Sequence, residues 1–374
     1  MLTIKEVKTA RDIKEFITLP LKMYKKCPYF VPPIYGDEKK LIKSGGNTEN
    51  AESVFFLAID GKKTVGRIHG IIEKQYNKAH NTKKVRFTRF DCIDDIDVAK
   101  ALFKAVEDWA AKKGMTEICG PLGFNDLDRE GLLIEGFEED STFEEQYNYE
   151  YYGKLIEGVG FEKDVDWLEY ELRMPKERNQ MLERVAKRTL ELNKLHIADT
   201  NMSKRKYIDK YRDDVFECID ICYRHLYGTV KLSKEVQDEI LSQFMIVMNK
   251  ECALFICDEN EKVVAFGLCF AGIGNALKKS GGRLTLPALI KLLKTVRKPK
   301  VIDLALVAVR PEYQQSGVNA VILNGMLDLL SKGTVEKCET NLNLETNTAV
   351  QAQWKYFDAR QHKRRRSYNK KIGE

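Results

Sequence analysis

The feature that most constrains this chain is an internal repeat. An apolar hairpin is predicted over residues 53–72, where a strand, a turn at Asp60–Lys63 and a return strand follow one another. The same pattern comes back over residues 252–270, with a turn at Asp258–Glu261 and again with glycine in the return strand. Because a recurring pattern of this length indicates a repeated structural unit, we expect two copies of one fold.

The elements that follow each hairpin also correspond. The apolar periodicity after the first hairpin predicts a strand, a helix and a second strand, at 85–92, 98–112 and 115–120. After the second hairpin the same three elements are predicted at 301–309, 320–331 and 337–344. Each copy then ends in a helix and a closing strand, predicted at 151–161 and 167–172 in the first copy and near residues 350 and 366 in the second.

This order of elements predicts an α/β (α+β) fold. We expect two copies, each a mixed, mostly antiparallel twisted sheet flanked by helices. Pro175 follows a strand and precedes a charged helix over 176–193, so the copies are expected to span residues 1–174 and 175–374.

The composition is that of a globular protein, with 374 residues of which 43% are apolar and 32% charged. The segment Met1–Glu6 becomes charged at once and no apolar run approaches the ~20 residues of a membrane span, so a cytoplasmic location is expected. Nine cysteines without a C-x-x-C pair fit thiols in a reducing compartment. The net charge of +6 suits an anionic ligand, and it would also suit nucleic acid or a lipid surface.

The stretch from Val301 to Ser331 predicts a phosphate cradle. A buried strand ends at Pro311, and a turn of polar and small residues, Gln314–Asn319, leads into an apolar helix. Such a turn leaves backbone N–H groups at the positive end of a helix dipole, where they hold an anion. Gly317 has no Cβ, so it lets the anion approach the backbone closely.

With the strand 337–344 and the segment after it, this region resembles the acyl-CoA-binding core of the GNAT acyltransferase superfamily. The superfamily pattern Gln/Arg-x-x-Gly-x-Gly/Ala is carried by Gln314, Gly317 and Asn319, and Asn319 departs from the usual Gly or Ala. Asn347 and the residues after it resemble the segment Asn-x-x-Ala-x-x-x-Tyr, in which Trp354 stands where a proton-donating tyrosine is often found. With the internal repeat, the whole chain resembles a tandem GNAT protein.

The resemblance implies acetyl-CoA or another acyl-CoA as co-substrate and no metal ion. It implies that backbone groups of the fourth strand and the cradle hold CoA, and the residues expected to bind it are Leu306, Val307, Val309, Gln314, Gln315, Ser316, Gly317, Val318, Asn319 and Asn347.

Acyl transfer from a thioester needs a polarised carbonyl and an unprotonated amine. Glu345, at the end of the strand beside the cradle, is the candidate base, and a solvated glutamate at a strand end is the alternative reading. Tyr313 and Tyr356 are candidates for the acid, in place of the tyrosine that Trp354 replaces.

The first copy has lost the cradle. Where the second copy has residues 311–319, the first has Asp91–Asp97 with four aspartates, whose charges repel a pyrophosphate. Asp97 is expected to cap the next helix. The resemblance therefore places the cofactor in the second copy and gives the first copy the acceptor side.

A predicted helix face, a histidine and a long connection each have a structural and a functional interpretation. Cys218, Cys222 and His225 are expected on one helix face, where core packing is favoured over a metal site that would lack a fourth ligand. His69 is expected to be a hydrogen-bonded strand residue. The connection 120–140 is either a solvated acidic loop, which is favoured, or a receptor for a cationic amine with an apolar body.

Two basic segments remain. The predicted helix near residues 286–298 has Leu286, Leu289, Ile290, Leu293 and Val296 on one face and cations on the other. A core-packed helix is favoured, and a helix lying on an anionic membrane is the alternative. The tail 362–371 is expected to be the final strand, with its cations exposed or facing CoA phosphates, in preference to a nucleic-acid tail.

The sequence thus predicts an N-acyltransferase that moves an acyl group from CoA thioester to an amine, with the acceptor pocket between the copies. The acceptor is a small-molecule or lipid amine, and nucleic acid is not expected as a partner. Long-chain N-acylation of a lipid-like, sphingoid amine is the alternative in this class, with peripheral membrane contact. A non-catalytic CoA-binding or interaction protein is the alternative from another class, motivated by Asn319 and Trp354.

Overall fold

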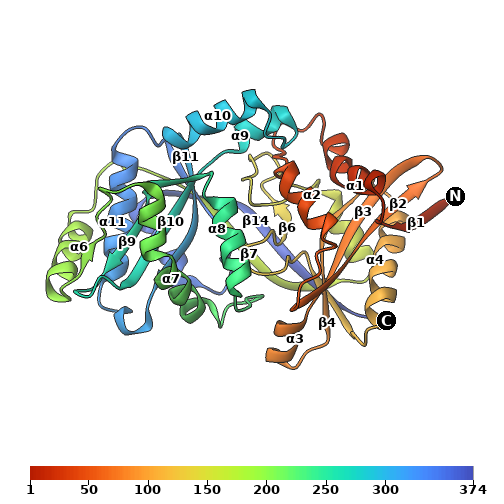
Figure 1. Ribbon diagram of the computed structural model, residues 1–374, viewed down its shortest axis with the longest axis horizontal. Coiled ribbons are helices and arrows are strands. Elements are labelled where there is room, and N and C mark those ends of the chain that lie inside the picture. The colour runs from red at the N-terminus through yellow and green to blue at the C-terminus, as the bar shows by residue number, and fades with distance from the viewer. Residues whose placement is uncertain (374) are drawn as a thin grey trace. The chain divides into compact units, whose positions relative to one another are not determined.

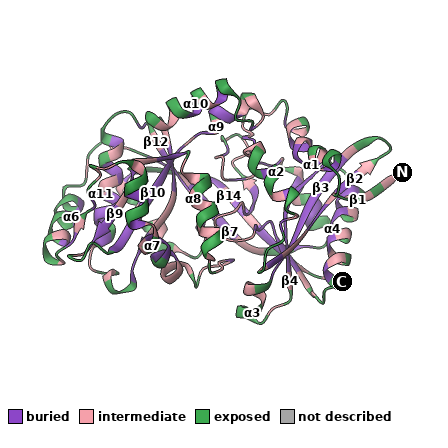
Figure 2. Ribbon diagram, in the orientation of Figure 1, coloured by how far each residue is buried: buried purple, intermediate pink, exposed green. Residues whose placement is uncertain are grey.

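A computed structural model describes residues 1–373, which form two compact units (Figure 1). Unit 1 contains Met1–Leu168, Gly274–Leu289 and the chain from His362 on, and unit 2 contains Glu169–Ile273 and Ile290–Gln361. In both units the central strands, such as β3 and β10, are the most deeply buried elements (Figure 2). No helix within residues 1–373 is both long enough and apolar enough to cross a membrane.

Unit 1 is built on a mixed sheet with the strand order β1-β2-β3-β4-β5-β14, and β6 pairs with β14. Neighbouring strands are antiparallel except for β4 and β5, which are parallel. The strands are β1 (Leu2–Glu6), β2 (Ala51–Asp60), β3 (Lys63–Glu73), β4 (Lys84–Cys92), β5 (Glu117–Gly120), β6 (Leu132–Glu135) and β14 (Asp358–Lys371).

Helices cover both faces of this sheet. Helix α4 (Ile96–Ala111) buries Leu102 and Phe103 against Phe87, and fully buried side chains of this kind contribute roughly 1.5–3 kcal/mol each. On the other face, α1 (Ala10–Met23) and α2 (Tyr35–Lys43) pack Phe16 and Ile42 against the hairpin β2–β3. The remaining helices of unit 1 are α3 (Lys74–His80), α5 (Tyr151–Gly158) and α9 (Gly274–Leu277).

Unit 2 contains the strand order β7-β12-β11-β10-β9-β8. Its strands are antiparallel except for the pair β11 and β12, which is parallel, as β4 and β5 are in unit 1. The strands are β7 (Glu162–Arg173), β8 (His196–Ile197), β9 (Met248–Cys257), β10 (Val263–Ala271), β11 (Val301–Val309), β12 (Lys337–Thr340) and β13 (Asn343–Leu344).

Two hydrophobic clusters lie on opposite faces of the unit 2 sheet. Helices α6 (Gln180–Leu192) and α11 (Val318–Ser331) pack on one face with Ile302 and Leu304, and α7 (Lys204–Tyr223) packs on the other with Ala308. The remaining helices are α8 (Lys234–Phe244), α10 (Leu286–Arg297), which begins in unit 1, and α12 (Thr348–Gln351), with short 3₁₀ turns at η1 (Lys278–Ser280), η2 (Pro311–Tyr313) and η3 (Ala352–Tyr356).

The two sheets share a detail that supports the predicted repeat. The ladder of β3 and β4 changes register around Arg89, which has φ 49°, and the ladder of β10 and β11 skips Ala305. Both irregularities fall at the same point of corresponding strands, just after the parallel pairing with the next strand ends. A bulge here bends the strand away from its parallel neighbour in each unit.

The strands that close each sequence copy, β7 and β14, are shared between the units. Residues 169–173 of β7 belong to unit 2 and pair with β12, whereas residues 362–371 of β14 belong to unit 1, where β14 pairs with β5. The boundaries of the compact units therefore differ from the predicted division at residue 174. That division describes the sequence repeat, and it stays a prediction.

The fold corrects several local expectations. Asp95, not Asp97, caps α4, because its side chain accepts from the backbone N–H groups of Asp97 and Val98. The cations in the middle of β14 are not exposed: Arg365 is fully buried, and Arg366 is paired with buried Asp166 at 2.8 Å. Only Arg360 and Lys371, near the ends of the strand, are exposed.

The connection 120–140 is not a solvated loop. Glu130 is buried within it, and burial together with the nearby Asp126 raises the pKa of Glu130 well above its usual value. The connection also contains strand β6.

On α10 the predicted core face is wrong as well. Ala288 and Leu292 are buried, whereas Leu286, Ile290 and Leu293 are exposed.

Candidate functional site

The turn between β11 and α11 has the geometry of an anion cradle. The single turn η2 is followed by Gln315 and Gly317, both with positive φ (68° and 90°), and α11 begins at Val318. Ser316 Oγ donates to the carbonyl of Tyr313 at 2.6 Å, which holds the turn closed. Strand, turn and helix thus lie where the sequence predicted them, and Tyr313 lies at the edge of the turn.

The cradle presents unpaired backbone donors. Within residues 1–373 the N–H groups of Gln315, Gly317, Val318 and Asn319 have no hydrogen-bond acceptor. The side chain of Asn319 is exposed and Val318 is buried in the core beneath the turn. Because these donors cluster at the positive end of a 14-residue helix, the turn can hold a phosphate group.

Helix α6 forms the back of the cradle. Thr189 Oγ1 donates to the carbonyl of Ser316 at 3.3 Å. A Cβ placed on Gly317 would lie 2.5 Å from this hydroxyl oxygen, well inside normal contact. Glycine at 317 is therefore required both by its φ and by the approach of α6.

Beside the cradle, the edge of β11 loses its strand partner. Pairing with β12 ends at Leu304, whose carbonyl accepts from the N–H of Asn341 at 3.0 Å. The backbone groups of Val307 and Val309 come after this point, where the two parallel strands separate. These are the groups that the resemblance assigns to the CoA arm.

Helix α7 covers this edge. The hydroxyl of Tyr223 donates to the carbonyl of Val307 at 2.9 Å and accepts from the N–H of Val307 at 3.2 Å. The carbonyl of Val309 accepts from Cys222 Sγ at 3.3 Å and from Gln314 Nε2 at 3.2 Å. Sequence reasoning missed Tyr223, because no spacing in the chain links the end of one helix to a strand so far along the sequence.

The candidate base stands in a short, locally anchored segment. Glu345 is half-buried directly after β13, and its backbone carbonyl accepts from Gln351 Nε2 at 3.2 Å. The side chain of Asn347 accepts from the N–H of Val350 at 3.3 Å and caps α12. Asn347 therefore has a structural partner already, which its predicted contact with CoA would have to replace.

The aromatic candidates differ in burial. Trp354 is buried, and its Nε1 donates to Asn343 Oδ1 at 3.3 Å, so it belongs to the core of unit 2. Tyr356 and Tyr313 are half-buried at the border of the same cluster, and Leu306 is half-buried on the opposite face, against α7. The two tyrosines thus keep partial access to solvent, whereas Trp354 does not.

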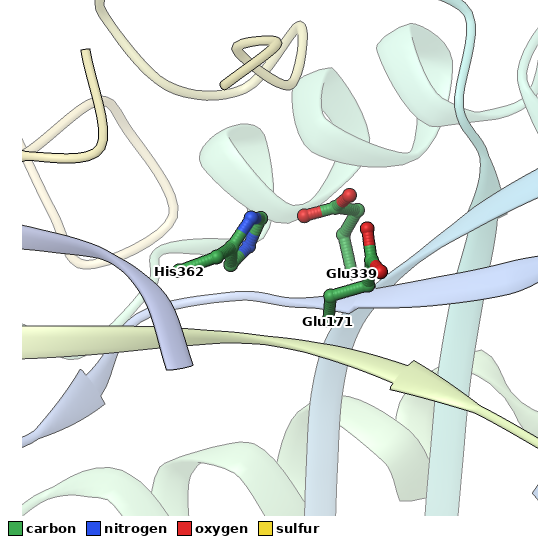
Figure 3. Close-up of side chains that lie close together, drawn as sticks. All are labelled: Glu171, Glu339 and His362. Carbon is green, nitrogen blue, oxygen red and sulfur yellow. The ribbon is translucent and has the colours of Figure 1, made fainter. Parts of the chain in front are cut away.

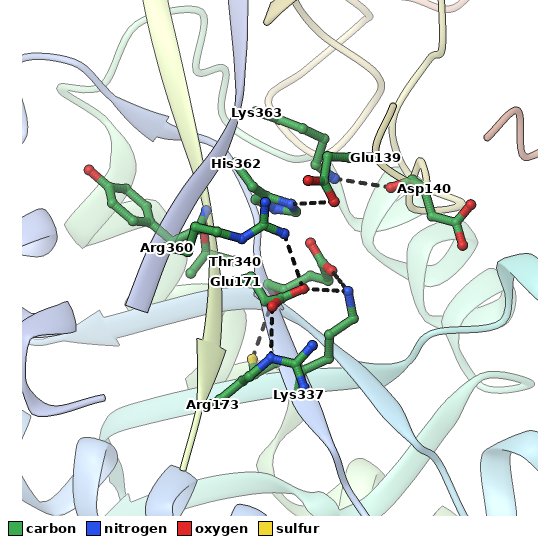
Figure 4. Close-up of polar contacts among 12 residues, drawn as sticks. Glu139, Asp140, Glu171, Arg173, Lys337, Thr340, Arg360, His362 and Lys363 are labelled. Atoms are coloured by element: carbon green, nitrogen blue, oxygen red, sulfur yellow. Dashed lines mark hydrogen bonds and ion pairs between the residues drawn. The ribbon is translucent and has the colours of Figure 1, made fainter. Parts of the chain in front are cut away.

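Sequence reasoning also missed a cluster of charges in unit 2. Glu171 of β7 faces Glu339 of β12 in the strand register, and Figure 3 draws both carboxylates. Lys337 Nζ donates to Glu171 at 2.7 Å and to Glu339 at 2.5 Å, and Arg173 Nε donates to Glu171 at 2.8 Å (Figure 4). Although burial opposes it, hydrogen bonds from Lys337 and Arg173 lower the pKa of Glu171 to about 2. These carboxylates are held by cations, and the expectation of no metal ion stays a prediction.

The expected helix face of Cys218, Cys222 and His225 is only partly present. Cys218 is buried and its Sγ lies 3.8 Å from that of Cys222, but α7 ends at Tyr223 and His225 is exposed beyond it. The predicted core packing is therefore confirmed for Cys218 and for the half-buried Cys222, and it is wrong for His225.

The equivalent region of unit 1 is filled by buried ion pairs. Asp91 Oδ2 accepts from Arg67 Nε at 2.7 Å, and Asp91 Oδ1 accepts from the hydroxyl of Tyr24 at 2.8 Å. Arg89, at the bulge, donates to both carboxylate oxygens of Glu38 at 3.0–3.2 Å. The absence of acyl-CoA binding in unit 1 stays a prediction, and these buried ion pairs agree with it.

His69 differs from the expectation of a hydrogen-bonded residue. It is fully buried and stacks on Phe55 at 3.9 Å, and neither of its ring nitrogens has a partner within residues 1–373. Burial, with the charges of Arg89 and Arg67, lowers the pKa of His69 well below its usual value, so the ring is neutral.

Comparison with solved structures defines the class of fold. The chain matches a tandem GNAT protein from the clavulanic acid biosynthesis pathway over 100% of its own length and 99% of that chain, with a TM-score of 0.57 and 11% identity. It matches a GCN5-related N-acetyltransferase from Sphaerobacter thermophilus over 99% of its length and 96% of that chain, with a TM-score of 0.51 and 10% identity. The predicted fold of two GNAT-like copies in tandem is confirmed.

Sequence comparison adds two relatives, while no protein-family model matches the chain. Protein YghO of Escherichia coli (strain K12) is 25% identical over 373 residues, which cover 96% of this chain and 93% of that protein. A bacterial ceramide synthase of Caulobacter vibrioides (strain NA1000 / CB15N) is 28% identical over 192 residues, which cover 50% of each. The similarity to YghO thus extends over nearly the whole chain, and that to the ceramide synthase over half of it.

Proposed function

We propose that this protein is an acyl-CoA-dependent N-acyltransferase, with the cofactor bound in unit 2. The observation that carries the proposal is the cradle Gln314–Asn319, whose unpaired N–H groups and Cβ-free Gly317 suit a pyrophosphate. The tandem GNAT fold supports the same assignment. Transfer forms a C–N bond to the amine and breaks the C–S bond of the thioester.

The residues of unit 2 divide this chemistry as follows. Once CoA displaces the hydroxyl of Tyr223, the N–H of Val307 donates to the pantetheine arm of CoA or to the thioester carbonyl, as a fixed donor in a partly buried strand. Glu345 takes a proton from the acceptor ammonium, directly or through water, so that the neutral amine attacks the thioester carbonyl. Tyr313 or Tyr356 returns a proton to the departing thiolate, because Trp354 has no acidic proton for that role.

The second candidate function is long-chain N-acylation, in which the acceptor is a lipid-like amine. The 28% identity to a bacterial ceramide synthase over half of each chain supports it, since a ceramide is a sphingoid base with an amide-linked acyl chain. A non-catalytic CoA-binding protein is the remaining candidate, because Asn319 and Trp354 depart from the residues usual at these positions in the GNAT pattern.

The test of the cradle is calorimetric titration with CoA, acetyl-CoA and palmitoyl-CoA, using Asn319→Glu. Substituting Gly317 would disturb the contact with Thr189, whereas the exposed Asn319 lies in the first turn of α11, where a carboxylate suits the helix dipole. The added charge repels the pyrophosphate, so affinity should fall about tenfold or more. Asn319→Ala, which removes the same amide without adding charge, is the matched control and should bind like the parent chain.

Release of free thiol in the presence of sphinganine or small amines then tests catalysis. Binding that Asn319→Glu abolishes, together with amine-dependent release, supports the enzyme. Binding without release of thiol from any amine favours the non-catalytic protein, and equal binding by both Asn319 variants removes the cradle assignment.

A further inference from the structure

Helix α10 carries an apolar face that nothing within residues 1–373 covers. Leu286, Ile290 and Leu293 follow one another at helical spacing and expose 72%, 47% and 54% of their surface. The helix is anchored on another face by the buried Ala288 and Leu292. A row of large exposed aliphatic side chains on an anchored helix is unusual for a surface in contact only with water.

Cations flank this apolar row. Between Gly281 and Lys300 the sequence has six Lys and Arg residues and no Asp or Glu. Lys294, Arg297 and Lys298 are exposed and form no ion pair within residues 1–373. The helix therefore presents an apolar row next to positive charge that is not neutralised by the chain itself.

We propose that α10 docks on an anionic lipid bilayer. A helix of this kind lies in the plane of the interface, with its aliphatic side chains among the acyl chains and its lysines at the headgroups. The proposal stands on α10 alone and does not require the acyltransferase activity. It would bring the protein to the surface where lipid-like amines reside.

The charge also argues against a second copy as the occupant. A symmetric dimer through this face would place the row of one copy on that of the other and leave Lys294 and Lys298 without an acidic partner, since residues 281–300 contain no Asp or Glu. Like charges at an interface oppose association, whereas an anionic surface neutralises them. An anionic bilayer would bury the apolar row and neutralise the cations at the same time.

The test uses vesicles of phosphatidylcholine alone and of phosphatidylcholine with phosphatidylglycerol, without CoA. Leu293→Trp keeps the position apolar and reports insertion, and its emission should shift to the blue with the anionic vesicles. In co-sedimentation, Ile290→Ser with Leu293→Ser, and separately Lys294→Glu with Lys298→Glu, should each weaken binding at least about tenfold. Met181→Ser with Leu192→Ser is the matched control, since these exposed apolar residues lie on α6.

Each outcome decides the matter. Binding to anionic vesicles that is lost in both α10 variants and kept in the α6 control supports the proposal. No binding by the parent chain, equal binding to neutral vesicles, or equal loss in the α6 control overturns it. Concentration-dependent dimerisation that the α10 serine variant abolishes would also overturn it, in favour of a second copy.

Discussion

Glu38 and Arg89 place opposite charges in the interior of unit 1. Both side chains are almost fully buried, and Arg89 donates to both oxygens of the carboxylate. Burial alone would raise the pKa of Glu38, but the charge and hydrogen bonds of Arg89 lower it to about 2. Such a pair is costly to break, because removing Glu38 leaves the buried charge of Arg89 with only the more distant Asp128, at 3.7 Å.

Glu38→Gln should therefore lower the free energy of unfolding at neutral pH by about 3–5 kcal/mol. The carboxylate has a folded pKa below its unfolded value of 4.5, so its contribution is complete above pH 4.5 and disappears as pH falls toward 2. Urea titrations across this range should show a smaller loss of stability in acid for the variant than for the parent chain. Glu6→Gln, at an exposed ion pair, is the control, and an equal effect of both substitutions would contradict the prediction.

Tyr223 competes, in our interpretation, with the CoA arm for the backbone of Val307. Tyr223→Phe should leave that N–H unpaired and thereby tighten CoA binding roughly fivefold or more, in line with a hydrogen bond of about 1 kcal/mol. Calorimetry measures the change. Tyr207→Phe, which removes a hydroxyl bonded to Ala253 elsewhere on α7, should leave affinity unchanged. Weaker binding by Tyr223→Phe would mean that the hydroxyl assists the ligand.

At the scale of elements, the junction of β11, its turn and α11 combines a strained backbone with a close contact. Gly317 has φ 90° and lies against Thr189 of α6, whereas Gly333, just after α11, has φ 71° and open space around it. Alanine at Gly333 would therefore meet backbone strain alone, whereas alanine at Gly317 would meet both strain and crowding.

Gly317→Ala should lower stability more than Gly333→Ala, which carries only the strain of roughly 1–2 kcal/mol. Adding Thr189→Ala to Gly317→Ala should recover part of the difference, because it removes the crowded hydroxyl. Thermal unfolding of these three variants and of the parent chain is the test. A loss of stability at Gly317 no greater than that at Gly333 would show that α6 moves aside to accommodate the added methyl group without a measurable loss of stability.

The elements themselves were accessible to sequence reasoning, because their apolar periodicity is local. The strand 301–309 and the turn 314–319 were predicted at their observed places for this reason. The coverage of Val307 by Tyr223 and the pairing of Arg366 with Asp166 were not, because they join residues far apart in the chain. The exposed row on α10 was assigned to the core because periodicity defines an apolar face but not what covers it.

At the scale of the whole molecule, the two sequence copies are not self-sufficient. The first copy lacks the strand residues 362–371 that complete unit 1, and the second lacks residues 169–173, which pair within unit 2. An open sheet edge of this kind favours aggregation.

Fragments 1–174 and 175–374 should therefore fail to unfold cooperatively when expressed alone, and they should co-purify when expressed together. Denaturant titration and affinity purification of one tagged fragment measure this. A chain cleaved after folding at a protease site inserted at residue 174 is the control and should stay associated. Cooperative unfolding of the isolated first fragment would contradict the interpretation.

The placement of β14 also sets an order of events during synthesis. Every other strand of unit 1 has left the ribosome before residues 362–371 are made, so the edge of β5 stays open while nearly the whole chain is translated. Contacts between such distant parts of a sequence form slowly and leave partly folded chains exposed. The nascent protein thus depends on residues 362–371 to close a sheet whose other strands are made much earlier, and the need for chaperones should be greatest before these residues emerge.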